Sequence, residues 1–270
     1  MLPRHRAGDR RRHTSLWRLP WLLLLVLFGA AGHAEPIRNP ADAGARAAPV
    51  ASDVPHYEPA TPTADGIGKR YMGRHIARVM GIGGAPWLER PEREREEQGE
   101  RLLAALGLRP GMVVADVGAG TGYHSRRMAR RVAPAGLVYA VDVQPGMLQA
   151  LRARATAEGI TNIRPVQAAE QRLNLPSRSL DLALMVDVYH ELAYPREVLQ
   201  DLARAMKPGG MIVFVEYRAE DARVPIRPLH RMSVAQVRRE AAAAGLRWSR
   251  RIDTLPWQHV LFFTVPEHRD

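Results

Sequence analysis

The sequence predicts an α/β fold in which helices cover both faces of a mostly parallel sheet. A short apolar run at 113–117, rich in β-branched residues and closed by glycine, is typical of a buried central strand. Further strand-like runs follow at 137–141, 163–166 and 180–186, and stretches with helical periodicity separate them. This alternation is the pattern of a parallel sheet. With 270 residues and 46% hydrophobic content, the chain can bury one such core and carry appendages.

The composition excludes several kinds of chemistry. The chain has no cysteine, which rules out disulfides, thiolate metal sites and cysteine nucleophiles. No His-Glu-x-x-His spacing occurs, so the sequence predicts no metal site. The net charge of +11 comes almost entirely from arginine, without the interleaved aromatic residues of a nucleic-acid groove. We therefore expect no specific nucleic-acid partner, and we interpret the arginine cluster at 126–131 as a solvated helix face.

Residues 1–34 have the composition of a targeting segment. Arginines precede an apolar run at 21–28, and small residues near Ala34 offer a cleavage site before Glu35. The run is shorter than the about 20 residues that a membrane-spanning helix needs. We therefore expect a signal peptide and an exported protein, periplasmic or associated with the envelope. The alternatives are an uncleaved N-terminal anchor, or a cytoplasmic protein if the segment is not used.

The following segments lead up to the main domain. Residues 35–70 are rich in Ala, Pro, Asp and Thr without periodicity, which indicates a flexible linker. Residues 71–80 have the pattern of a short amphipathic helix. A second helix is expected at 94–106, with Gly107 in the usual stop position. The sequence thus divides into segments 1–34, 35–70, a helical segment at 71–107 and a domain at 108–266.

The domain is organised around the glycine loop that follows its first strand. Three glycines alternate with other residues at 118–122, so the backbone can turn tightly and a ligand can lie against bare peptide. Amides at the start of the next helix, which runs to about Val132, can face a polar or anionic group. Asp116, at the strand end, can accept from an ammonium group or fix the loop. The loop departs from the Gly-x-Gly-x-x-Gly dinucleotide fingerprint, because Tyr123 stands where the third glycine would fall.

A second acidic residue, Asp142, ends the next strand. A carboxylate at the tip of the neighbouring strand can bind both hydroxyls of a ribose. Alternatively, Asp142 caps the helix that starts near Pro145. A glycine loop followed one strand later by an acidic tip is more specific than either feature alone.

These motifs resemble those of class I S-adenosylmethionine-dependent methyltransferases, of the methyltransferase type 11/25-like kind. The run Asp-Val-Gly-Ala-Gly-Thr-Gly at 116–122 is similar to motif I of that family, and Asp142 to its ribose-binding acid. Residues 180–185 match its fourth strand, and 206–210 match the turn before its fifth. The resemblance extends over about 94–265. It implies a Rossmann-like three-layer sandwich whose seven-stranded, mostly parallel sheet has an antiparallel last strand.

The resemblance also implies a cofactor, S-adenosylmethionine, and its contacts. Asp116 and the glycine loop would hold the methionine portion, and Asp142 the ribose. Glu170 or Gln171, with apolar neighbours, would contact the adenine, and the segment at 71–107 would form a lid. The layout is closest to the small-molecule methyltransferases of quinone biosynthesis, so we expect a small-molecule acceptor. The full set of expected cofactor-binding residues is Asp116, Gly118, Ala119, Gly120, Thr121, Gly122, Asp142, Val143, Glu170, Gln171 and Asp187.

The catalytic candidates lie where the fourth strand ends, in Asp-Val-Tyr-His-Glu-Leu at 187–192. In open α/β sheets, ligands bind outside the carboxyl ends of the strands. His190 is the natural general base, because its unperturbed side-chain pKa alone among these residues lies near neutrality. Tyr189, and Glu216 at the end of the fifth strand, are the further candidates. Alternatively, Asp187 supports the cofactor loop and the residues after it begin a helix.

The remaining chain completes the predicted sheet, with the last two strands as a hairpin pair. The expected elements are a helix at 195–206, a strand at 211–215, a helix at 234–244 and strands at 246–253 and 260–265.

Two other functions are consistent with the sequence. One is an exported, non-catalytic binding module on a methyltransferase fold, which would bind no cofactor or bind it without turnover. The other is an NAD-dependent oxidoreductase, which Tyr123 disfavours and which NADH binding would reveal. No sequence feature indicates the oligomeric state.

Overall fold

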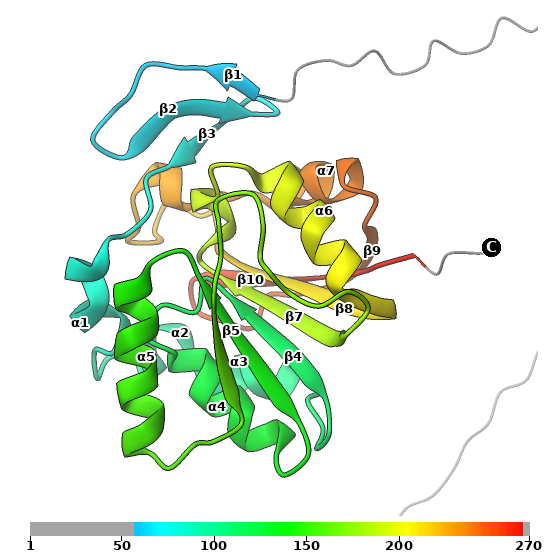
Figure 1. The fold of residues 1–270 in the computed structure, drawn as a ribbon. Helices are drawn as coiled ribbons and strands as arrows, with labels where there is room; N and C mark the ends of the chain where they lie inside the picture. The colour runs from blue at the N-terminus through cyan, green and yellow to red at the C-terminus, as the bar shows by residue number, and fades with distance from the viewer. Residues whose placement is uncertain (1–56, 267–270) are drawn as a thin grey trace, which may run out of the picture. The chain divides into compact units, whose positions relative to one another are not determined.

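A seven-stranded sheet forms the centre of the fold (Figure 1). The structure is a computed structural model that describes residues 57–266. The strand order is β6-β5-β4-β7-β8-β10-β9, and within this sheet only β10 runs opposite to the other strands. The predicted α/β fold with an antiparallel last strand is confirmed. The strands are β4 (Val113–Val117), β5 (Leu137–Asp142), β6 (Ile163–Gln167), β7 (Leu180–Val186), β8 (Met206–Tyr217), β9 (Arg247–Ile252) and β10 (Gln258–Thr264).

Helices cover both faces of this sheet and create two separate apolar cores. Alternate residues of each strand point to opposite faces, so Val114 and Ala115 of β4 belong to different cores. The helices α6 and α7 pack on the face that carries Ala115, and α3 and α4 pack on the face that carries Val114. The helices are α3 (Gly99–Ala105), α4 (Tyr123–Val132), α5 (Pro145–Ala157), α6 (Pro195–Ala205) and α7 (Val234–Ala243).

A small antiparallel sheet stands where the sequence predicted a helix at 71–80. It consists of β1 (Tyr57–Pro59), β2 (Gly66–Tyr71) and β3 (Arg74–Ala77). Met72 and Gly73 connect β2 to β3 with φ angles of 48° and 83°, and a two-residue turn with two positive φ angles matches the twist of a β-hairpin. The helical prediction is therefore wrong, and so is the linker prediction over 57–70, where β1 and β2 lie.

The predicted helix at 94–106 is divided into α2 (Arg93–Glu97) and α3. The break falls at Gln98, whose φ is 51°. It brings Gly99 against the ring of Tyr123, where a Cβ would lie 3.0 Å from the nearest ring carbon. A short helix α1 (Ala85–Leu88) and the single-turn 3-10 helix η1 (Ile82–Gly84) precede α2. The segment before the domain therefore contains both a hairpin and helices.

The parallel strands bring the chemically interesting residues to one edge of the sheet. The carboxyl ends of β4, β5 and β7 adjoin, because β4 pairs with β5 on one side and with β7 on the other. Beyond β7 the chain forms the 3-10 helix η2 (Tyr189–Glu191), and the loop after β8 contains a second one, η3 (Pro228–His230).

The N-terminal predictions concern a different part of the chain. The predicted signal peptide at 1–34, and the linker as far as residue 56, lie outside the described residues. Between residues 57 and 266, no helix has the length and apolar character needed to cross a membrane.

Candidate cofactor and catalytic site

A cavity of about 620 Å³ lies at the carboxyl ends of β4, β5 and β7. Its size is within the range of small-molecule sites, about 300–1,000 Å³. The glycine loop, the strand tips, η2, η3 and residues around α1 all contribute to its wall. The fold therefore gathers segments from most of the domain around one ligand-sized space.

The glycine loop shapes this cavity through close packing. Gly118, Gly120 and Gly122 have φ angles of 74°, 52° and 84°, which L-residues with side chains rarely adopt. A Cβ on Gly118 would lie 2.3 Å from Val188 Cγ2, so no larger residue fits there. The Gly118 and Ala119 amides both donate to the carbonyl of Val141, at 2.8 and 2.9 Å. These two amides tie the loop to β5 and do not face the cavity as free donors.

Asp116 fixes the start of α4. Its buried Oδ2 accepts a hydrogen bond from Ser125 Oγ at 2.5 Å. Burial raises the pKa of this carboxyl to about 6. Of the two roles that the sequence suggested for Asp116, fixing the loop is the one with a visible contact.

Asp142 joins the glycine loop to the loop after β5. Its Oδ2 accepts from the Gly120 amide at 2.9 Å, and its Oδ1 accepts from the Gln144 amide at 2.8 Å. The N-cap residue of α5 is Gln144, so Asp142 does not cap that helix. Burial raises the pKa of the Asp142 carboxyl. Each of its oxygens still has acceptor capacity for a ligand hydroxyl.

The residues predicted to face adenine are only partly brought together. Val143 is 40% exposed and lines the cavity beside Asp142, and Glu170 also lines it. Gln171 is exposed and is not part of the cavity wall. Met147 and Leu173 add apolar surface on this side.

Asp187 presents an unpaired acceptor at the cavity. It adopts a left-handed backbone conformation with φ 51°. Its Oδ2 accepts from Gln258 Nε2 at 2.8 Å, whereas its buried Oδ1 has no hydrogen-bond partner among residues 57–266. Burial, together with the nearby Glu97 and Glu216 carboxylates, raises the pKa of Asp187 well above its usual range. A buried carboxylate oxygen without a partner is costly, so a ligand with a donor group fits here.

The three catalytic candidates occupy different positions. His190 is buried and lines the cavity. Glu216 lies behind it with Oε2 at 2.5 Å from His190 Nδ1, while its Oε1 accepts from the Tyr189 amide at 3.0 Å. The Tyr189 ring packs edge-on against Phe214, with 4.9 Å between ring centroids, and is not part of the cavity wall. The geometry thus places His190 at the cavity and Glu216 behind it, with Tyr189 in the core.

Two histidines at the cavity were not identified from the sequence. His230, from η3, approaches His190, with 3.2 Å between His230 Nδ1 and His190 Nε2. His124, in the first turn of α4, is buried, and neither of its ring nitrogens has a partner within the described part of the chain. Burial lowers the pKa of His124 well below its usual value, so the ring is neutral. His230 is 40 residues from His190 in the chain, and only tertiary structure reveals the pair.

The comparison with known families agrees with this geometry. Residues 114–210 match the family model described as "Methyltransferase domain". That match starts in β4 and contains the glycine loop, Asp142 and the polar cluster after β7. The chain carries a class I methyltransferase domain.

Individual relatives of this methyltransferase domain are similar over part of its length. The ubiquinone/menaquinone biosynthesis C-methyltransferase of Laribacter hongkongensis is 31% identical over 129 residues, which are 47% of this chain and 51% of the relative. The chain thus spans about half the length of the curated relatives that it matches. A SAM-dependent methyltransferase from Aquifex aeolicus has a TM-score of 0.66 and 26% identity, covering 69% of this chain and all of the other. The [4+2]-cyclase SpnF shares the fold alone, with a TM-score of 0.53, 18% identity and coverage of 62% and 81%.

The segment before the methyltransferase domain contacts the glycine loop. Thr121 Oγ1 donates to Glu89 Oε1 at 2.6 Å, and Arg126 Nη2 pairs with Glu89 Oε2 at 2.9 Å. Trp87 and Arg93 line the cavity. Arg126 is buried, so the interpretation of the arginine cluster as a solvated face is wrong at that position. These contacts hold the segment against the glycine loop at the cavity wall.

The S-adenosylmethionine that this family uses fits the residues at the cavity. Asp142 offers two carboxylate oxygens for a pair of ribose hydroxyls, and exposed Val143 offers an apolar surface for adenine. The unpaired Asp187 Oδ1 is an acceptor for a charged or polar donor. The cavity therefore offers acidic acceptors and an apolar surface, which are the kinds of group that this cofactor needs.

Proposed function

We propose that the protein is an S-adenosylmethionine-dependent methyltransferase that acts on a small-molecule acceptor. The observation that supports this proposal is that Asp142, the candidate ribose-binding acid, and His190 line the same cavity. The methyltransferase family match supports the same reaction class. The acceptor would lie on the His190 side, toward η2 and η3.

The cofactor would be held by residues from three strand tips. Asp142 would accept from the ribose, Val143 and Glu170 would contact the adenine, and Asp187 would accept from the ammonium group of the methionine part. Asp116 would act indirectly, because its visible contact fixes the loop through Ser125. When bound, S-adenosylmethionine supplies an electrophilic methyl group.

His190 would orient the acceptor or take its proton. Glu216 would accept from Nδ1–H, and the lone pair of the neutral ring would then be on Nε2. A positioned general base contributes about 10²–10⁴-fold to a rate. Apolar walls around the cavity would exclude water from the methyl-transfer step.

The acceptor class to test first is a quinol or related phenol. The Laribacter relative is named for C-methylation in ubiquinone and menaquinone biosynthesis. A phenol or an enol loses a proton as it is methylated, which fits an imidazole in the cavity wall. We expect the full chain to convert S-adenosylmethionine to S-adenosylhomocysteine in the presence of such an acceptor, and His190→Gln to lower the rate at least tenfold.

The same assay separates the alternatives. Cofactor binding without turnover, on quinols and on small-molecule fractions of cell extract, would favour the non-catalytic binding module. Binding of NADH in place of S-adenosylmethionine would favour the oxidoreductase. Product formation that is independent of His190 would leave the reaction class standing and refute the proposed catalytic role.

We also propose that the protein is exported, on the basis of residues 1–34 alone. Mass spectrometry of the protein from the envelope fraction of a bacterial host should give an N-terminus at Glu35. A cytoplasmic protein that retains residue 1 would contradict this proposal.

A further inference from the structure

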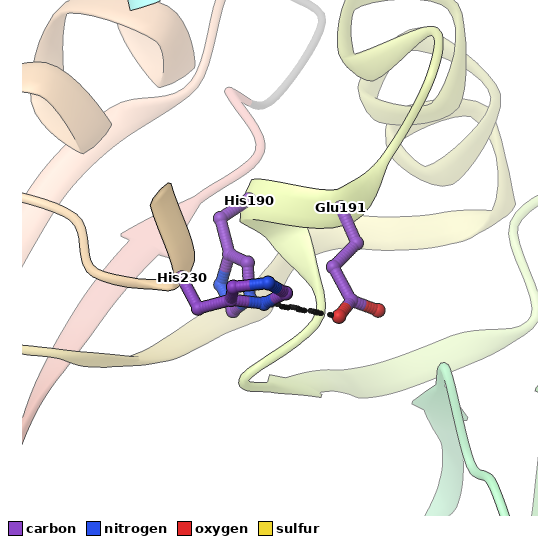
Figure 2. A group of neighbouring side chains, drawn as sticks. All are labelled: His190, Glu191 and His230. Atoms are coloured by element: carbon purple, nitrogen blue, oxygen red, sulfur yellow. Dashed lines mark hydrogen bonds and ion pairs between the residues drawn. The ribbon is translucent and has the colours of Figure 1, made fainter. Parts of the chain in front are cut away.

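Three side chains of the cavity wall point toward one another (Figure 2). His190 Nε2 lies 3.2 Å from His230 Nδ1 and 3.9 Å from Glu191 Oε1. His230 Nδ1 lies 3.3 Å from the same Glu191 oxygen. All three residues belong to the cavity wall, so the triangle that their atoms form faces ligand space.

The surrounding contacts fix the orientation of two of the three ligand atoms. Glu216 lies 2.5 Å from His190 Nδ1, so a neutral His190 ring that donates Nδ1–H to Glu216 has its lone pair on Nε2, inside the triangle. The other oxygen of Glu191, Oε2, accepts from the Met80 amide at 3.4 Å, which turns Oε1 toward the histidines. The His190 and Glu191 side chains are only 2% and 10% exposed, and that of His230 is 21% exposed.

We propose that His190, Glu191 and His230 bind a divalent transition-metal ion, of which Zn²⁺ is the best representative. A triangle with these sides has a point about 2.0 Å from all three atoms, which is the length of a Zn–N or Zn–O bond. Imidazole and carboxylate are ligands that Zn²⁺ and neighbouring first-row ions accept. A metal-bound histidine usually donates the N–H of its other ring nitrogen to a carboxylate, a backbone carbonyl or water. Glu216 lies in that position against Nδ1 of His190.

This site has three protein ligands and therefore open coordination positions. Sites with three protein ligands and an open position are typical of catalytic zinc, whereas structural zinc sites use four. In the proposed methyl transfer, an ion here would occupy the His190 nitrogen that otherwise takes a proton. The ion would instead bind the acceptor oxygen and lower its pKa. That last step rests on the proposed function, whereas binding of the ion does not.

Metal uptake by the purified, untagged full chain tests the site. Chelator-stripped protein would be dialysed against graded concentrations of free Zn²⁺, and bound metal measured by elemental analysis. We expect one ion per chain, with at least tenfold weaker binding in His230→Ala and in Glu191→Gln. His75→Ala is the matched control, because His75 is a partly buried histidine that bonds Arg70 outside the cluster. It should bind like the unmodified protein.

Glu191→Gln keeps the side-chain shape and the acceptor for the Met80 amide, so it remains informative if His230→Ala does not fold. Absorption of bound Co²⁺ should also change in both cluster variants and stay unchanged in His75→Ala. A folded protein without stoichiometric uptake would overturn the proposal, and so would uptake that both cluster variants retain. Titration of S-adenosylmethionine into the same samples separates failure of the metal site from failure of the proposed function.

Discussion

Glu216 Oε2 lies 2.5 Å from His190 Nδ1, and both side chains are almost completely buried. The pair links the end of β8 to the 3-10 helix after β7, two strands that adjoin in the sheet. A carboxylate in this position fixes both the orientation and the tautomer of the imidazole. His190 thus presents Nε2 to the cavity whether that nitrogen binds a proton, an acceptor or an ion.

The first prediction concerns this pair. Glu216→Gln keeps the side-chain shape but removes the charge that holds the Nδ1–H tautomer. We expect the turnover rate of methyl transfer to fall by about 10–100-fold. This is the range of the loss when a residue that hydrogen-bonds and orients a metal-ligating histidine is replaced. The affinity for S-adenosylmethionine, measured by calorimetry, should stay within about twofold because Glu216 is not part of the cavity wall. An unchanged turnover rate would show that Glu216 is only structural.

The second prediction concerns Asp116 and pH. Its pKa is about 6 in the folded protein, above the about 3.9 of an unfolded aspartate. The folded state therefore holds the proton to higher pH than the unfolded state, and stability falls as pH rises from about 4 to 6. We expect the free energy of unfolding of Asp116→Asn, relative to the unmodified protein, to rise by roughly 2–3 kcal/mol between pH 4 and pH 7.5.

Denaturant titrations of both proteins at several pH values check this prediction. Other carboxyl groups titrate in both proteins, so the difference between the two isolates Asp116. A difference that is flat, or that declines with pH, would mean that the buried carboxyl does not carry the expected penalty.

The third prediction concerns the packing of the glycine loop. Gly118→Ala places a Cβ 2.3 Å from Val188 Cγ2 at a φ of 74°. We expect a loss of about 2–5 kcal/mol in the free energy of unfolding, from a left-handed alanine and an overpacked neighbour together. Gly111→Ala is the control, because Gly111 has a φ of 88° and nothing within 4 Å of an added Cβ. It should lose only the backbone part, about 1–2 kcal/mol.

A second substitution separates the two contributions at Gly118. In Gly118→Ala with Val188→Ala, the clash is relieved in part while the backbone conformation is unchanged. Urea unfolding should show less destabilisation than the sum of the two single variants. Strict additivity would contradict the close packing of this loop against Val188.

The sequence predicted the sheet well because its strands are bounded by unambiguous residues. Residues 113–117 and 180–186 form the strands β4 and β7 with the same bounds as predicted. Apolar runs that are buried on both faces are distinctive, and glycine or an acidic residue ends each of them. Asp142 ends β5 in the same way, and it lines the cavity.

The hairpin of β2 and β3 was not predicted from the sequence, because the hydrophobic pattern of these two strands is short. Met72, Ile76 and Val79 follow one another at intervals of four and three residues, which also suits one face of a helix. Met72 adopts a positive φ that a methionine rarely has, so the turn lacked the usual residues.

The site itself was predictable only where its residues are local in sequence. Tyr189 adjoins His190 in the chain, yet it points into the core, since the 3-10 helix turns successive side chains apart. His230 and Glu191 belong to segments that the sequence interpreted as a loop and the start of a helix. A local spacing motif does not reveal this cluster, because it combines residues 190–191 with residue 230.

The most direct test of the account is calorimetric titration of S-adenosylmethionine and S-adenosylhomocysteine into the full chain and Asp142→Asn. The change removes the charge of a carboxylate that accepts from the glycine loop and that we propose binds the ribose. Hydrogen bonds to charged groups contribute about 1.5–3 kcal/mol, so we expect the unmodified protein to bind both ligands and the variant to bind them at least tenfold more weakly. A folded, unmodified protein that binds neither ligand would contradict the assignment of the cavity as a cofactor site.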